Sequence, residues 1–330
     1  FRSPQVEAGR LKTFIETELS ECQANLPEKW NTNMAGRVTK YTAAALLGKY
    51  YMFIGEKAKA KTEFWKVIDS HRYELMENYG DNFNGLHENN KESILEVQFT
   101  GSLEGGHYEY NLFTLHLGPD SGCGAYEEAY PSKWLFNTLK KDLTEDGEYS
   151  DRLYETIIFD DPKSRPFYYE DGKGFSDYHQ EDNIYWRKYV TYDKSLGDYW
   201  DYSGFNIPLI RYADILLLYA ECLNDEGNSK EAIKYINKVR DRVHVTPLSD
   251  TLSKEQVLKH LQDVERPCEL ALEGSRWYDL IRWGIVEDAL KSHEKPFASN
   301  FISTKHIRLA IPHKEFLMNP DWVQNEGYTK

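Results

Sequence analysis

The stretch LLGKYYMFIGEKAKAKTEFWKV, residues 46–67, decides the fold that we expect for this chain. Apolar and small residues recur there every three or four positions on both sides of a glycine, which predicts two helices joined by a tight turn. The pattern is carried by Leu47, Gly48, Tyr51, Gly55, Ala60, Phe64 and Val67. The small residues Gly48 and Ala60 would let the two helices approach each other closely.

The same pattern occurs a second time, far along the chain. The matching positions are Tyr219, Ala220, Leu223, Gly227, Ala232, Ile236 and Val239. They predict one helix from about Pro208 to Asn224 and another from about Ser229 to Val243. The order and offsets in both copies are those of the tetratricopeptide repeat, whose hairpins bury their apolar faces only by stacking. We therefore expect a mainly α fold built on tetratricopeptide-like helical hairpins.

Two further helices are predicted beside these hairpins. One precedes the first copy and has apolar residues at three-to-four spacing, namely Leu11, Phe14, Ile15, Leu19, Cys22 and Leu26. The other begins at Ser253, whose hydroxyl makes a capping box with Gln256, and it ends at Gly274.

The segment between the two copies is rich in glycine, aspartate, proline and tyrosine. Short strands are predicted at Ser93–Phe99 and Tyr185–Tyr192, where β-branched and aromatic residues dominate. We expect three parts: N-terminal helices with the first hairpin over 1–75, a loop-rich and aromatic-rich insertion over 76–206, and the second hairpin with the C-terminal helices over 207–330. Long irregular insertions on a helical scaffold are more often functional than idle.

Composition limits the partners of the chain. Its formal charge of -14 argues against nucleic acid, because phosphate backbones attract lysine and arginine. No apolar run reaches the roughly 18 residues of a membrane span. The four cysteines, Cys22, Cys123, Cys222 and Cys268, have no metal-binding spacing, so we expect no zinc and no cofactor. Buried thiols are predicted for the three that lie in helical patterns, Cys22, Cys222 and Cys268. The sequence leaves open whether the aspartate-rich turns bind calcium weakly.

The stretch ERPCELALEGSRWYDLIRWG, residues 265–284, combines dense charge with two tryptophans. Glu265, Glu269 and Glu273 repeat every four residues and would form one stripe on a helix, with Arg266 and Arg276 close enough to neutralise it. Charges among aromatic residues cost desolvation unless each is paired. We interpret the stripe as structural. The alternative is a carboxylate pair for acid/base catalysis, but the segment supplies no nucleophile.

This stretch resembles the "ER..EL..EG.RW.DL.RWG" signature of the SusD/RagB family, the surface glycan-binding lipoproteins of Bacteroidetes. Other stretches resemble further family segments, in the family's order along the chain. They are LP followed by GRVTKYTAAALLGKYYMFIG (26–55), KESILEVQF (91–99), DGEYSDRLYETI (146–157), NIPLIRYADILLLYAECLNDEG (206–227) and IPHKEFLMNPDWVQNEGY (311–328). The number and order of these matches make the resemblance specific.

The resemblance implies an outer-membrane, cell-surface protein that captures oligosaccharide or polysaccharide and passes it to a TonB-dependent SusC-like transporter, over which it sits as a lid. Family members begin with a lipidated cysteine and a long helical region ahead of the "LP" segment, which here starts at Leu26. We therefore expect a C-terminal portion, with the lipid anchor, the only membrane attachment, in the missing N-terminal region. Cys22 is not that anchor, because ETELSECQANL lacks the apolar run of a signal peptide.

Aromatic residues concentrate between positions 165 and 206, and two interpretations compete there. Some rings fill a small core, which we expect of Trp186 and Tyr189. Others bind carbohydrate, because the apolar face of a sugar lies on a flat ring while polar neighbours take the hydroxyls. We expect ligand-binding residues in turn-rich sequence and in the loop 101–120, facing solvent as platforms: Tyr108, Tyr110, Tyr168, Tyr169, Tyr199, Trp200 and Tyr202.

Common catalytic motifs are missing from the chain, including HExxH, GxSxG, GxxxxGK[ST] and GxGxxG. The acidic pairs Asp160–Asp161 and Glu181–Asp182 are sequence neighbours, which point apart in strands, whereas a glycoside hydrolase needs two carboxyls facing one cleft. We therefore predict binding without catalysis. The alternative is a tetratricopeptide-type scaffold for protein–protein interaction, which would carry its aromatic surplus on the inner helices and not on the insertion loops.

Overall fold

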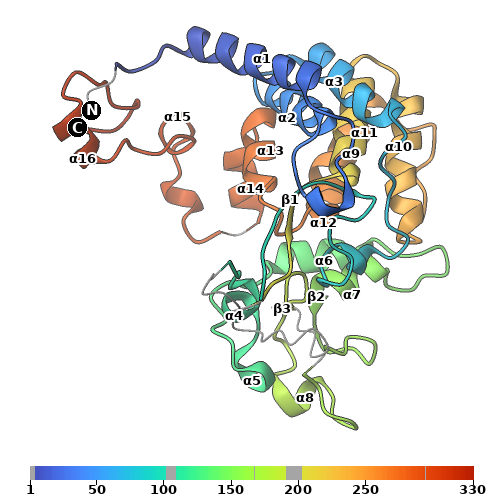
Figure 1. The fold of residues 1–330 in the computed structure, drawn as a ribbon. Helices are drawn as coiled ribbons and strands as arrows, with labels where there is room; N and C mark the ends of the chain where they lie inside the picture. The colour runs from blue at the N-terminus through green and yellow to red at the C-terminus, as the bar shows by residue number, and fades with distance from the viewer. Residues whose placement is uncertain (1–3, 102–108, 167, 191–202, 294) are drawn as a thin grey trace.

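The computed structural model describes residues 4–101, 109–166, 168–190, 203–293 and 295–330. Over these residues the chain is mainly α-helical with a few short strands, which confirms the predicted fold class. A helical body holds both repeat copies, and a loop-rich layer lies below it (Figure 1). The division into 1–75, 76–206 and 207–330 stays a prediction.

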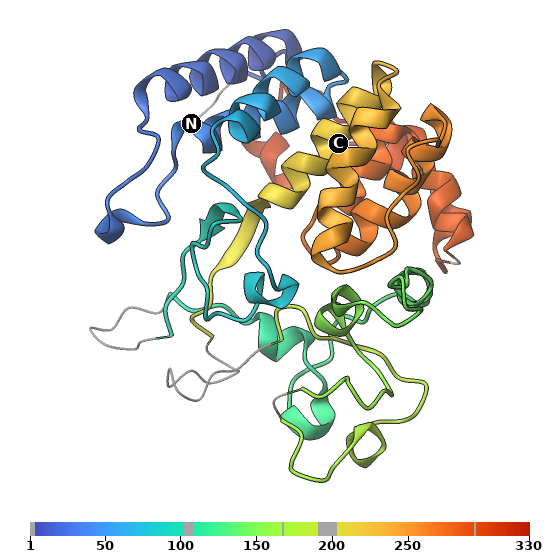
Figure 2. The ribbon, with the colours of Figure 1, turned by 90° about the vertical axis from the view of Figure 1, so that its right-hand side faces the viewer.

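The helical body contains both predicted hairpins and the helix that precedes them (Figure 2). Its helices are α1 (Ala8–Asn25), α2 (Lys40–Phe53), α3 (Lys57–Asp69), α9 (Tyr212–Asp225) and α10 (Ser229–Arg242). Helix α2 packs on α3 and α9 packs on α10, while the contact of α3 with α9 joins the two hairpins. One core runs between them and includes Leu47, Phe64, Leu217 and Ile236. The structure therefore confirms the stacked hairpins.

Local sequence explains where the hairpin helices begin and turn. The side chains of Thr39 and Asn228 cap α2 and α10 by accepting hydrogen bonds from backbone amides of the first turn. Gly55 and Gly227 follow the first helix of each hairpin with φ angles of 80° and 85°. Glycine is the residue least strained in this left-handed conformation, so both hairpins turn at the predicted glycines.

A pair of strands connects the helical body to the layer below it. Strand β1 (Ser93–Val97) pairs antiparallel with β4 (Ile207–Arg211), with Glu96 opposite Pro208. The predicted start of a helix at Pro208 is therefore wrong, because residues 208–211 form backbone hydrogen bonds with β1. Proline is tolerated there because the two-stranded sheet has only edge strands.

The residues between β1 and β4 form the loop-rich layer (Figure 1). Its elements are α4 (Phe113–Leu117), α5 (Asp120–Cys123), α6 (Lys133–Lys141), α7 (Asp151–Thr156), β2 (Ile157–Ile158), α8 (Phe175–Tyr178) and β3 (Tyr185–Trp186). A 3₁₀ turn, η2 (Tyr79–Asn82), precedes β1, and another, η1 (Thr32–Met34), precedes α2. Strands β2 and β3 pair antiparallel. A second core, which includes Leu139, Leu153 and Val190, holds the layer together.

Two predictions for this layer can be compared with the structure. Trp186 and Tyr189 are 7% and 1% exposed, which confirms that they belong to the core. Of the strand expected over 185–192, the structure describes residues 185–190, and among these only Tyr185–Trp186 form a strand, because the chain turns at Tyr189, where φ is 63°. The strand expected over 93–99 is confirmed for Ser93–Val97.

The C-terminal helices follow α10. They are α11 (Lys254–His260), the π-helical turn η5 (Leu261–Glu265), α12 (Arg266–Glu269), α13 (Arg276–Trp283), α14 (Val286–Ser292), the 3₁₀ turn η6 (Ala298–Asn300), α15 (Ser303–His306) and α16 (His313–Met318). The capping box of Ser253 and Gln256 is confirmed. The helix ends at Glu269 and not at Gly274. Pro267 has no amide hydrogen to continue the helical ladder, and the helix widens in the turn before it.

The N-terminal residues of the described chain contact its C-terminal region. The Gln5 side chain donates to the Val323 carbonyl and accepts from the Val323 amide. Cys222 and Cys268 are buried, as predicted, whereas Cys22 is half-buried. Within the described ranges, no helix combines the length and the apolar character that a membrane crossing requires.

Candidate ligand-binding site

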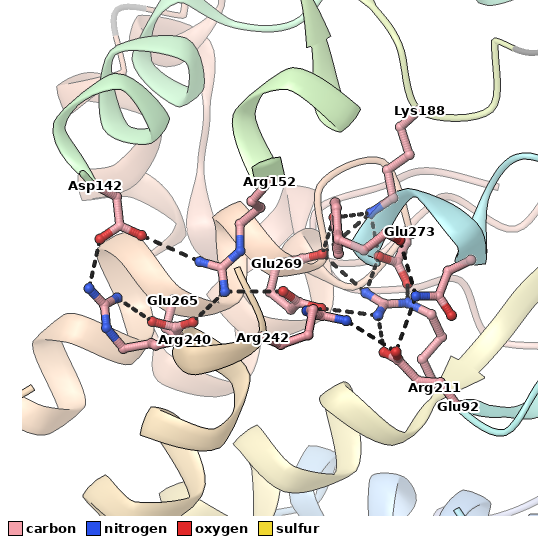
Figure 3. A network of polar contacts seen from close by, with 12 residues as sticks. Glu92, Asp142, Arg152, Lys188, Arg211, Arg240, Arg242, Glu265, Glu269 and Glu273 are labelled. Carbon is pink, nitrogen blue, oxygen red and sulfur yellow. Dashed lines mark hydrogen bonds and ion pairs between the residues drawn. The ribbon is translucent and has the colours of Figure 1, made fainter. Parts of the chain in front are cut away.

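The carboxylates of the 265–284 stretch lie in a buried network of ion pairs (Figure 3). Glu265 and Glu269 are 0% exposed. Arg152 contacts both, with Nη2 at 2.7 Å from Glu265 Oε1 and 3.1 Å from Glu269 Oε2. Arg240 pairs with Glu265 at 2.7 Å and with Asp142 at 2.8 Å.

Arg211 forms the other half of the network (Figure 3). Its guanidinium contacts Glu92, Glu269 at 3.0 Å and Glu273 at 2.7 Å. Arg242 also contacts Glu92 and Glu269, and Lys188 pairs with Glu273. Asp142, Arg152 and Lys188 belong to the loop-rich layer, so the network joins that layer to the helical body.

The predicted partners of the glutamate stripe are wrong. Arg266 pairs with Asp214 and Asp279, each at 2.8 Å, and not with the stripe. Arg276 donates to the Gln262 carbonyl at 2.6 Å and lies 5.2 Å from the centre of the Trp134 ring. The arginines that do pair with the stripe are far away in sequence. The structural interpretation of the stripe is supported, because all three glutamates are paired with cations.

The network predicts a loss of stability in acid. Burial raises the pKa of Glu269, but Arg242, Arg211 and Arg152 outweigh it and lower that pKa to about 2. As pH falls, the unfolded state therefore takes up this proton first. We expect the ionised Glu269 to contribute about 3 kcal/mol to the free energy of unfolding. This contribution is complete above about pH 5 and is lost as pH falls towards 2.

This prediction can be checked by denaturant unfolding at a series of pH values. The variant Glu269→Gln should be less stable at pH 7 and should show a shallower decline between pH 5 and pH 2. If the two proteins decline with the same slope, Glu269 is not a source of the acid sensitivity.

Of the predicted ligand-binding residues, the structure describes Tyr110, Tyr168 and Tyr169, whereas Tyr108, Tyr199, Trp200 and Tyr202 lie outside the described residues. Tyr110 precedes Asn111, which exchanges two backbone hydrogen bonds with Ser203, at 2.8 and 3.1 Å. The Asn111 side chain also donates to the Phe205 carbonyl at 2.7 Å. This bridge brings the 109–111 and 203–205 segments side by side.

Tyr168 and Tyr169 belong to an aromatic cluster. Tyr169 stacks on Tyr178 with ring centres 4.9 Å apart and planes 5° apart. The Tyr168 hydroxyl lies 3.2 Å from His179 Nε2. Both tyrosines are half-buried, so they differ from the fully solvent-facing platforms that we expected. Their ring faces are used partly within the cluster, which the sequence pattern does not reveal.

A cavity of about 410 Å³ lies against this cluster. Its lining comes from α5, α8, the turns that follow them and the first residue of β3: Asp120, Ser121, Glu127, Ser176, Asp177, Tyr178, His179, Gln180, Asn183 and Tyr185. None of these residues was predicted as a ligand contact. Tyr178 and Tyr185 belong to the aromatic surplus of 165–206, which is the one signal that pointed towards the cavity.

Two exposed aromatic residues were also not predicted. Tyr126 and Tyr130 are 62% and 54% exposed. Tyr130 donates to Glu127 Oε2 at 2.6 Å, and its ring centre is 6.0 Å from that of Tyr185. The rim of the cavity therefore carries an exposed ring.

Comparison with known proteins places this arrangement in a family. Residues 24–328 match the model of the SusD family. The chain belongs to the SusD family. The SusD-like protein P25 of Formosa agariphila is 26% identical over 98% of this chain and 66% of its own length. The SusD-like proteins of F. agariphila and Bacteroides ovatus are covered over 50% to 66% of their lengths, so the chain spans less than two thirds of these relatives.

Solved structures of SusD-like proteins have the same fold. A SusD superfamily protein from Bacteroides vulgatus has a TM-score of 0.85 and 26% identity, covering 99% of this chain and 70% of that one. A laminarin-binding SusD-like protein has a TM-score of 0.76 and 26% identity, covering 98% and 70%. Surface glycan-binding protein A from Bacteroides thetaiotaomicron, solved with laminarihexaose, is 22% identical with a TM-score of 0.73 and shows the shared fold alone.

Proposed function

We propose that this SusD-family protein binds oligosaccharide through its loop-rich layer and does not cleave it. The observation that carries the proposal is the similarity to the laminarin-binding SusD-like protein, which is 26% identical with a TM-score of 0.76. The tyrosines of the layer support it, because sugar rings pack on aromatic faces and polar neighbours take their hydroxyls. Exposed tyrosines and a polar-lined cavity occur together there.

Binding without catalysis agrees with the state of the signature carboxylates. Glu265, Glu269 and Glu273 are paired with arginine or lysine and buried or nearly so. A general acid needs a protonated carboxyl at neutral pH, whereas the pKa of Glu265 is lowered by Arg152, His260 and Arg240 against the opposing effect of burial.

Membership of the SusD family supports two further proposals. The protein would act at the cell surface of the outer membrane, and it would deliver its glycan to a TonB-dependent SusC-like transporter. Attachment through a lipid anchor stays a prediction from the resemblance. Co-purification of such a transporter with the tagged protein from outer membranes would test the partnership. If the tagged protein is recovered from these membranes without a transporter, the proposed partnership is contradicted.

Calorimetry tests the binding proposal. A Tyr168→Ala/Tyr169→Ala pair should weaken oligosaccharide binding by about 1 to 3 kcal/mol, because both tyrosines belong to the aromatic cluster of the proposed site. Some stability should be lost too, since both rings are half-buried, so affinity is measured on protein that far-ultraviolet circular dichroism shows to be folded.

Tyr278→Ala is the matched control for this pair. Tyr278 is 59% exposed and contacts Phe53 on the helical body, away from the loop-rich layer. If the control weakens glycan binding and the Tyr168/Tyr169 pair does not, the site lies on the helices. Binding of peptides but of no oligosaccharide would favour the alternative of a tetratricopeptide-type scaffold.

A further inference from the structure

The cavity beside the aromatic cluster has a lining that is held in place by its own hydrogen bonds. Glu127 accepts from the Asp120 amide at 2.7 Å and from the Tyr130 hydroxyl at 2.6 Å. Asn183 donates to the Tyr185 hydroxyl at 2.8 Å. These contacts fix the acceptor groups before any ligand arrives, which lowers the entropy cost of binding.

The lining also has hydrogen-bonding capacity that the described residues leave unused. The side chains of Ser121, Ser176 and Gln180 are exposed and make no hydrogen bond to another described residue. His179 is 8% exposed, and its buried Nδ1 has no hydrogen-bond partner among the residues that the structure describes. The half-buried Tyr178 adds apolar ring surface to this polar wall, whereas Tyr185 is 4% exposed. The volume of about 410 Å³ lies within the range of roughly 300–1,000 Å³ that small-ligand pockets occupy.

The charges of the lining select between classes of sugar. Its carboxylates are Asp120, Glu127 and Asp177, and none of the described residues that line it is a lysine or arginine. Lys173 reaches Asp177 from outside the lining, at 3.9 Å. Burial lowers the pKa of His179 to about 4, so this imidazole is uncharged near neutral pH. A carboxylated or sulfated sugar would therefore meet a net negative charge, because three carboxylates face one lysine.

A metal ion is a poorer occupant than a sugar. Three carboxylates line the cavity, yet among the residues that the structure describes no group of three or more histidine, cysteine, aspartate or glutamate side chains is placed to hold a metal ion. Calcium needs six to eight oxygen ligands at about 2.3–2.6 Å. The carboxylates instead suit the hydroxyl groups of a sugar, which donate hydrogen bonds to them.

We infer that this cavity binds one or two uncharged sugar units of the oligosaccharide, with the half-buried Tyr178 against the ring and Asp120, Glu127 and Asp177 accepting hydrogen bonds from its hydroxyls. This inference rests on the proposed function and adds to it a location and a ligand class. Acidic glycans are excluded from the cavity by its carboxylates.

The first experiment blocks the cavity. Ser176→Trp places a large ring on an exposed position of the lining, and Ser249→Trp is the matched control at an exposed serine of the loop between α10 and α11. Isothermal titration with laminarihexaose, maltohexaose, xylohexaose and a galacturonate hexamer should show binding of at least one neutral hexamer by the unmodified protein. For that hexamer, Ser176→Trp should raise the Kd at least tenfold and Ser249→Trp should leave it unchanged.

A second blocking variant is needed in case Ser176→Trp does not fold. Gln180→Trp blocks the cavity from a second position in its lining, and melting curves identify whichever blocking variant remains folded. Asp120→Asn/Asp177→Asn should reduce the discrimination against the galacturonate hexamer, because it removes two charges from the lining while keeping oxygen acceptors.

The possible outcomes distinguish failure of the cavity assignment from failure of the proposed glycan-binding function. Unchanged affinity for the neutral hexamer in folded Ser176→Trp and Gln180→Trp would overturn the cavity assignment and leave glycan binding intact. Tighter binding of the galacturonate hexamer than of any neutral hexamer would overturn the ligand class. Failure of the unmodified protein to bind any of the four hexamers would count against the proposed function and against the cavity with it.

Discussion

The substitution Arg211→Met should lower the free energy of unfolding by about 3 to 5 kcal/mol, the cost typical of removing one partner from a buried ion pair. Arg211 is 1% exposed and contacts Glu92, Glu269 and Glu273. Methionine fills much of the same volume but leaves these carboxylates short of a counter-charge. The loss arises mainly from buried negative charge and not from an empty space.

Denaturant unfolding of Arg211→Met can be compared with that of Arg10→Met. Arg10 lies on the exposed side of α1 and has no ion pair to another described residue, so its replacement should change the unfolding free energy by less than about 0.5 kcal/mol. If Arg211→Met were as mild as this control, the network would not contribute to stability in the way that its geometry indicates.

The second large effect is expected at the crossing of α2 and α3. Gly48→Leu should destabilise the protein by about 1 to 3 kcal/mol or more through overpacking. A Cβ atom at Gly48 would lie 2.5 Å from Phe64 Cε1, and Phe64 is 0% exposed. The ring cannot withdraw without disturbing the core, and this cost exceeds the helix propensity of about 1 kcal/mol that leucine gains over glycine.

Gly9→Leu is the matched control for this prediction. Gly9 also lies in a helix, α1, but a Cβ atom there meets no other atom within 4 Å. Gly9→Leu should therefore leave stability unchanged or raise it slightly. A double variant, Gly48→Ala/Phe64→Leu, should lose less than the sum of its single variants if the two residues compete for one space. Additive losses would show that the two positions are not coupled.

The hairpins could be predicted from sequence because their determinants are local. Gly55 and Gly227 mark the turns, and apolar spacing marks the helices on either side. The strand at Ile207–Arg211 could not be predicted, because it depends on pairing with Ser93–Val97, far away in the chain. Arg152 and Arg211 could not be assigned to the glutamates for the same reason: only the fold brings them together.

The candidate site was predicted in part. The aromatic surplus of 165–206 pointed to the correct segment for Tyr178 and Tyr185, but Asp120 and Glu127 come from a separate stretch and share no sequence signal with it. Tyr168 and Tyr169 were expected as exposed platforms. Turn-rich sequence indicates a loop, yet it does not show that the loop folds back and packs its rings against each other.

The pairing of β1 with β4 means that the loop-rich layer leaves the helical body and returns to it through neighbouring strands, which lie about 4.8 Å apart. A segment whose ends are this close can be exchanged for one of another length at little cost in loop-closure entropy. Transplanting the corresponding segment between relatives is thus a route to new ligand specificity on one scaffold. Any transplant has to keep Asp142, Arg152 and Lys188, because without them arginines and glutamates of the recipient would lose their counter-charges.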